Sequence, residues 1–135
     1  MPEITKLNLG TLVRLDCDFE TAVTRTTTAL KAEGFGILTE IDVKETMKKK
    51  LDKDLLPYKI LGACNPPLAY QALNAAPEVG LLLPCNVTVR QLEDGDIEVG
   101  FVDPMMLLGA VSHPELATIA EDARARLDRA TQAIQ

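Results

Sequence analysis

The segment from Tyr58 to Arg90 constrains the fold of this 135-residue chain more than any other. It holds two apolar runs, and each carries a Cys-Asn pair, in the phrases GACNPP at 62–67 and LPCNV at 83–87. Short apolar runs bounded by turn-forming residues are typical of buried β-strands. If the chain has a functional site, we expect it where these two runs meet.

The first run predicts a strand over Tyr58–Cys64 that is covered on both faces. Asn65 then has the position of a helix N-cap, and the two prolines after it suit the first turn of a helix, where the missing N–H groups cost nothing. We expect this helix to end before Pro77.

The second run predicts the longest strand of the chain, over Gly80–Leu92. Pro84 cannot donate a hydrogen bond to a neighbouring strand, so it indicates an edge, a bulge or a bend. Asp94-Gly95 favours a hairpin turn, which predicts a returning strand over Ile97–Val102.

The N-terminal part predicts a strand over Leu12–Asp16, followed by a helix that Asp18 caps and Gly34 closes. Strict alternation predicts a strand over Gly36–Val43. Asp42, with an acidic residue three positions later, then begins a second helix.

The C-terminal part predicts a short helical turn over Met105–Leu108, which the Asp103-Pro104 pair caps. Ser112 and Glu115 have the spacing of a capping box for a long last helix. The apolar side of this helix repeats at helical spacing: Leu116, Ile119, Ala120, Ala123, Leu127, Ala130 and Ile134.

These elements follow the order β-α-β-α-β-α-β-β-α in one domain, residues 1–135. We therefore predict an α+β fold, a two-layer sandwich in which helices pack on a mixed, largely antiparallel sheet of about five strands. No glycine-rich phosphate-binding pattern follows any predicted strand.

Composition excludes several classes of partner. The net charge of −6 and the absence of Trp argue against a nucleic-acid or anionic-membrane partner. The N-terminal residues lack the pattern of a signal peptide, and no apolar run reaches the roughly 18 residues of a membrane span. Three cysteines, none at Cys-x-x-Cys spacing, favour a reducing compartment, so we expect a cytoplasmic protein.

Three segments together resemble a known family: GFGILTEIDVK at 34–44, YKILGACNPPLA at 58–69 and GLLLPCNV at 80–87. They are similar to the domain of unknown function family 302, and the similarity extends over about residues 19–127. This family occurs mostly in bacteria and archaea as small α+β proteins. The resemblance implies a homodimer, and it implies no reaction.

Cys64 and Cys85 are the strongest candidates for chemistry. Cys64 precedes the predicted N-cap, where the free N–H groups and the helix dipole favour a thiolate. Core packing is the alternative for both cysteines, since free Cys is among the most buried residue types. If the two are neighbours, they could form a redox pair or a soft-metal site, with Met105 or Met106 as thioether ligands.

The polar candidates for a ligand pocket are Glu40, Tyr58, Asn65 and Asn86, two of which belong to the Cys-Asn phrases. His113 is the single histidine, so sites with several His ligands are excluded, and a haem axial role has little support.

The sequence carries no nucleophile–base or acid–base set, which favours a non-catalytic function. We expect a homodimeric module that binds a small ligand or a partner near Cys64–Pro67 and Pro84–Asn86; no cofactor can be named. The alternative is a thiol-dependent redox, soft-metal or haem-handling protein that uses Cys64 and Cys85. A purely structural dimer, in which both phrases serve folding, is the third hypothesis.

Overall fold

Six strands form one sheet in the order β1-β2-β6-β5-β4-β3, and every pairing is antiparallel. The computed structural model describes residues 3–135. Residues 1 and 2 lie outside the described residues; they belong to the expected domain and to the N-terminal segment considered for a signal peptide. The strands are β1 (Glu3–Lys6), β2 (Gly10–Leu15), β3 (Gly36–Asp42), β4 (Tyr58–Cys64), β5 (Cys85–Gln91) and β6 (Ile97–Val102).

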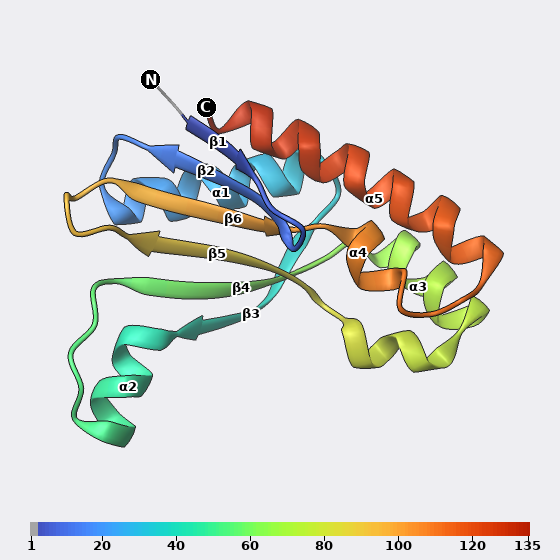
Figure 1. Ribbon diagram of the computed structural model, residues 1–135, viewed down its shortest axis with the longest axis horizontal. Coiled ribbons are helices and arrows are strands. Elements are labelled where there is room, and N and C mark those ends of the chain that lie inside the picture. Colours follow the sequence, from blue (N-terminus) through green and yellow to red (C-terminus); the bar gives the residue numbers. More distant parts are fainter. Residues whose placement is uncertain (1–2) are drawn as a thin grey trace.

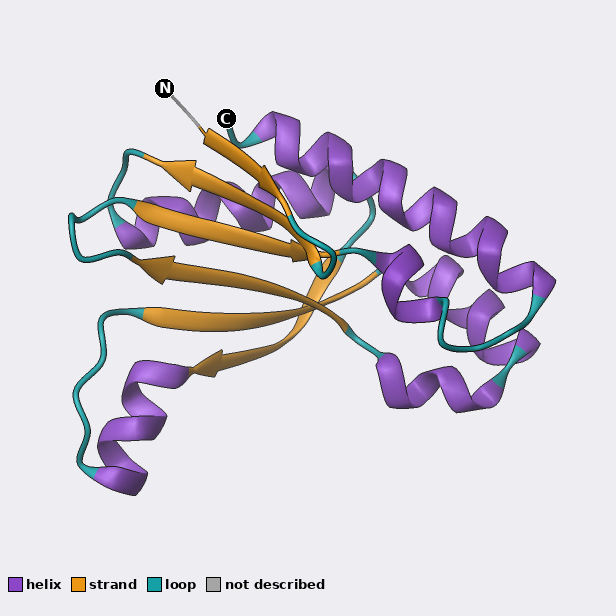
Figure 2. Cartoon of the chain, viewed as in Figure 1, coloured by secondary structure: helices purple, strands orange, loops and turns teal. Residues whose placement is uncertain are grey.

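The helices cover one face and one end of this sheet (Figures 1 and 2). They are α1 (Phe19–Ala32), α2 (Val43–Leu51), α3 (Pro66–Ala75), the 3₁₀ helix η1 (Pro77–Leu82), α4 (Pro104–Leu108) and α5 (Pro114–Ala133). The predicted α+β sandwich is confirmed. The sheet has one strand more than expected, and it is antiparallel in all five pairings rather than mixed.

Strand β1 is the element that the sequence did not reveal. All four of its residues are exposed, so the segment lacks the apolar alternation by which a strand is recognised. It is held by pairing with β2, from Glu3 opposite Arg14 to Lys6 opposite Thr11.

The central strand β4 has the predicted boundaries and lies between β3 and β5. The Asn65 side chain accepts a hydrogen bond from the Leu68 N–H at 3.3 Å, and two prolines fill the first turn of α3. This strand–cap–helix unit confirms the local prediction.

The expected long strand over Gly80–Leu92 is wrong in its first half. The segment Pro77–Leu82 forms η1, and the strand begins only at Cys85. The run of leucines suggested alternation, but Leu81 is 89% exposed. Pro84, which has no N–H for a strand ladder, stands just before the first residue of β5.

Two other local expectations need correction. The alternation of β3 is interrupted by a register shift between Ile37 and Thr39. Leu38, which lies at this shift, is at the surface and is 67% exposed. The N-cap of α5 is His113 rather than Ser112, because the His113 Nδ1 accepts the Glu115 N–H at 3.2 Å.

The core lies between the sheet and the layer formed by α1 and α5, which contact each other. In Figure 1, α1 lies behind the strands, and α5 runs along the upper side of the sheet and beyond its end. All seven residues of the apolar stripe predicted for the last helix are buried. In contrast, α2 has no buried residue and stands outside the sheet edge next to β3 (Figure 1). No helix among residues 3–135 has the length and apolar character needed to cross a membrane.

Replacing Thr26 by valine should stabilise the protein. Thr26 is fully buried in α1, and its hydroxyl has no hydrogen-bond partner. Because Val has nearly the same shape and no polar atom, Thr26→Val should raise the free energy of unfolding by about 1 kcal/mol in denaturant titration. Thr28→Val, at an exposed position of the same helix, is the control. An equal or larger gain there would contradict this explanation.

Candidate functional site

A cavity of about 300 Å³ lies where β4 and β5 meet the helices at the end of the sheet. Its walls come from the β4–α3 turn, the start of β5, and helices α3, α4 and α5. Most of the side chains that line it are apolar: Phe35, Leu38, Ala63, Leu68, Ala69, Ala72, Leu73, Leu83, Pro84, Pro104, Leu107, Leu108, Ile119 and Ala123. The remaining three are Cys64, Asn65 and Cys85.

The structure brings Cys64 and Cys85 to the same cavity. Ala63 pairs with Cys85 across the β4–β5 ladder, so Cys64 is one residue beyond that pair. Both cysteines are free thiols and partly buried. The two apolar runs that each carry a Cys-Asn pair therefore do meet, at the end of the sheet.

Both thiols are protonated at neutral pH. Burial, with a smaller contribution from the nearby Cys64, raises the pKa of Cys85 to about 11. Burial also raises the pKa of Cys64. The expected thiolate at the start of α3 is thus not favoured, because burial removes hydration from the charged form. A nucleophilic role for either thiol has no electrostatic support.

The shifted pKa of Cys85 predicts a pH-dependent stability. Its folded value of about 11 lies above the ordinary 9.0, so folding favours the neutral thiol. This contribution is complete below pH 9 and is lost as the pH rises to about 11. Denaturant titrations across this window should show a smaller loss of stability in Cys85→Ala than in the wild type. Equal losses would assign the pH dependence to other groups.

Asn65 lines the cavity, but its polar groups are already engaged. Its Oδ1 caps α3, and its Nδ2 donates to the Glu33 carbonyl at 3.4 Å. The residue is only 7% exposed. It holds the β4–α3 turn against the end of α1, so it shapes the cavity and offers a ligand little hydrogen bonding.

The structure leaves the other predicted site residues away from this cavity. Glu40 is bound to Lys59, with 2.7 Å between its carboxylate oxygen and Nζ. Tyr58 stands at the far end of β4, opposite Arg90. Asn86 lines a separate shallow groove that includes Thr88 and Gly100. These three side chains do not form one site with the cysteines.

Helices α4 and α5 supply cavity walls that the sequence did not reveal, including Leu107, Ile119 and Ala123. The apolar stripe of α5 was visible, but its packing partner was not. Neither Met105 nor Met106 is among the lining residues. Within residues 3–135, no group of three or more His, Cys, Asp or Glu side chains is arranged to hold a metal ion.

The chain matches the family model described as "Domain of unknown function DUF302" over residues 12–134. The chain belongs to the DUF302 family. This match covers the whole sheet except β1 and the start of β2, and it includes every residue that lines the cavity. The resemblance expected from the sequence is confirmed.

A solved DUF302 structure is similar to this one throughout. The crystal structure of an uncharacterized conserved DUF302 protein from Bacillus stearothermophilus matches with 33% sequence identity and a TM-score of 0.84. The match covers 92% of this chain and 96% of that one. No curated protein matches the chain significantly.

Proposed function

We propose that this DUF302 protein is a non-catalytic cytoplasmic module that binds a small apolar ligand in the cavity at the end of the sheet. The observation that carries the proposal is the meeting of both Cys-Asn phrases at one apolar cavity. The three cysteines, all free thiols, suit a reducing compartment.

The cavity's polar groups favour an apolar ligand. The Asn65 amide already makes one hydrogen bond at its oxygen and one at its nitrogen, and the other polar side chains of the lining are two neutral thiols, which are weak hydrogen-bond partners. A ligand with several polar groups would lose its hydration without replacement bonds. The volume, about 300 Å³, is at the lower end of small-molecule sites, so the ligand is small.

Blocking the cavity tests this function. Ala69 is a half-exposed residue of α3 on the cavity wall, so Ala69→Phe should fill the space without unfolding the protein. Indole and 1-octanol serve as apolar probes. We expect both to raise the melting temperature of the wild type and to leave that of Ala69→Phe unchanged.

Ala125→Phe is the matched control, since Ala125 is exposed on α5 and does not line the cavity. It should respond to the probes as the wild type does. Native mass spectrometry of freshly purified protein adds a second measurement. Absence of both a probe response and a co-purifying small molecule would overturn the proposal.

The second candidate function is thiol redox or soft-metal handling by Cys64 and Cys85. The observation in its favour is that both thiols line one cavity. Two thiolates can bind a soft monovalent ion such as Cu(I), and metal binding would displace both protons. A stoichiometric Cu(I) complex that is lost in Cys64→Ser and Cys85→Ser would support it. Its absence would exclude the metal.

We also propose that the protein is a homodimer, as its family resemblance implied. Several large apolar side chains are exposed along β3, α2 and the loop after α2: Leu38, Ile41, Leu51, Leu55 and Leu56. Concentration of exposed apolar residues along one edge is typical of protein contact surfaces. Native mass spectrometry should give the mass of two chains, and a monomer mass at all concentrations would contradict the proposal.

A further inference from the structure

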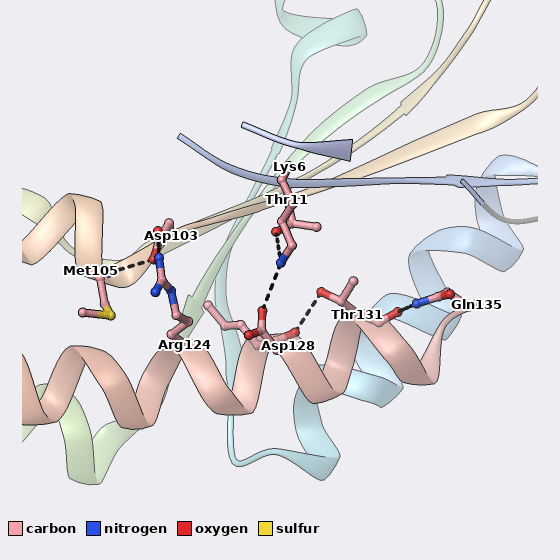
Figure 3. Close-up of polar contacts among 9 residues, drawn as sticks. Lys6, Thr11, Asp103, Met105, Arg124, Asp128, Thr131 and Gln135 are labelled. Carbon is pink, nitrogen blue, oxygen red and sulfur yellow. Dashed lines mark hydrogen bonds and ion pairs between the residues drawn. The ribbon is translucent and has the colours of Figure 1, made fainter. Parts of the chain in front are cut away.

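A second cavity, of about 380 Å³, lies between the β1–β2 hairpin and α5. Unlike the apolar cavity, it is lined by charged and hydroxyl side chains that converge from the hairpin, the end of β6 and α5 (Figure 3). These polar residues are Lys6, Thr11, Asp103, Arg124, Asp128 and Thr131. The proposed apolar-ligand function uses none of them.

One of the two ion pairs in this groove is closed. Arg124 Nε is 3.1 Å from Asp103 Oδ1, and Arg124 Nη2 is 2.5 Å from Asp103 Oδ2. Asp103 also accepts the Met105 N–H at 3.0 Å and thereby caps α4. This pair joins α4 to α5 and forms a fixed end wall of the groove.

The other ion pair is open. Lys6 Nζ and the nearest Asp128 oxygen are 3.9 Å apart, which is too far for a hydrogen bond. The Lys6 side chain is 71% exposed and that of Asp128 is 53% exposed. An exposed pair of this kind contributes about 0–1 kcal/mol, so a ligand can separate the two groups at little cost.

Two threonine hydroxyls stand beside this open pair. Thr11 Oγ1 lies 3.4 Å from Lys6 Nζ, and its own hydrogen is free to donate. Thr131 Oγ1 donates to the Leu127 carbonyl at 2.9 Å, which leaves its oxygen free to accept. Thr11 is 8% exposed and Thr131 is 4% exposed, so both belong to the inner wall of the groove.

We propose that this groove binds a small zwitterion that carries one carboxylate and one ammonium group, as an α-amino acid does. The carboxylate binds the Lys6 ammonium and the Thr11 hydroxyl, and the ammonium binds the Asp128 carboxylate and the Thr131 oxygen. Because the groove contains two cations and two carboxylates, a simple anion or a simple cation meets as much repulsion as attraction. A zwitterion places a group of opposite charge next to both Lys6 and Asp128.

The test is an NMR titration of the ¹⁵N-labelled protein with L-alanine, propionate and ethylammonium. L-alanine should shift the backbone amide signals of Thr11 and Thr131 in a saturable way. Its affinity should exceed that of either singly charged analogue by about tenfold, the size of one hydrogen bond to a charged group. Lys6→Met and Asp128→Asn should each weaken it to a similar degree.

Lys50→Met and Glu121→Gln are matched controls at exposed positions outside the groove, and they should bind L-alanine as the wild type does. Ala69→Phe should also bind it normally, because Ala69 lines only the apolar cavity. No saturable shift, equal affinity for propionate, or unchanged affinity in Lys6→Met and Asp128→Asn would each overturn the inference.

Discussion

Leu30→Ala should lower the free energy of unfolding by about 2–5 kcal/mol. Leu30 is fully buried in the last turns of α1, in the core between the sheet and the layer formed by α1 and α5. Removing three carbon atoms there loses their transfer free energy and leaves a space that the β-strands and α5 cannot fill by a small shift. Chemical denaturation followed by circular dichroism would measure the loss.

Leu81→Ala makes the same change at a position that is 89% exposed in η1. It should change the free energy of unfolding by no more than about 0.5 kcal/mol, as surface substitutions do. If both variants lost the same stability, burial of Leu30 against the sheet would not be the cause.

Gly62→Ala should destabilise the protein by about 1–3 kcal/mol, the usual cost of an overpacked core. A Cβ at this position would overlap Thr39 Oγ1 of β3 and would lie 2.8 Å from Pro84 Cγ. Gly62 lies in the central strand, where it pairs with Thr39 of β3, and Pro84 directly precedes β5 on the other side.

Gly36→Ala is the matched control in the adjoining strand, because a Cβ there meets no atom within 4 Å. It should leave stability nearly unchanged. Thr39→Ala combined with Gly62→Ala should recover part of the loss, since it removes one of the two contacts. A double variant as unstable as Gly62→Ala would show that Pro84 alone, and not Thr39, restricts this position.

Local sequence determined most of the individual elements. Asp18, Asn65 and Asp103 have side chains that satisfy free N–H groups at a helix start, and all three act as the predicted N-caps. The boundaries of β4 and β6 were likewise predicted, because turn-forming residues frame both runs. The DUF302 family could also be identified from three short phrases.

Expectations failed where a pattern depended on packing. The leucines before Pro84 suit either a strand or a 3₁₀ helix, and only the contacts of η1 with α3 and α4 select the helix. Strand β1 carries no apolar signal and exists because β2 offers a free edge. The β3 bulge similarly depends on its pairing with β4.

The sequence by itself determined most of the elements, most of their caps and the two Cys-Asn phrases. Only the tertiary structure decided that Cys64 and Cys85 share a cavity and that Tyr58, Asn86 and Glu40 lie elsewhere. Caps and turns depend on residues within one helical turn, so they can be recognised locally. A cavity depends on strand register and on helix docking between segments far apart in the chain, such as β4 and α5, and single-sequence periodicity does not encode these contacts.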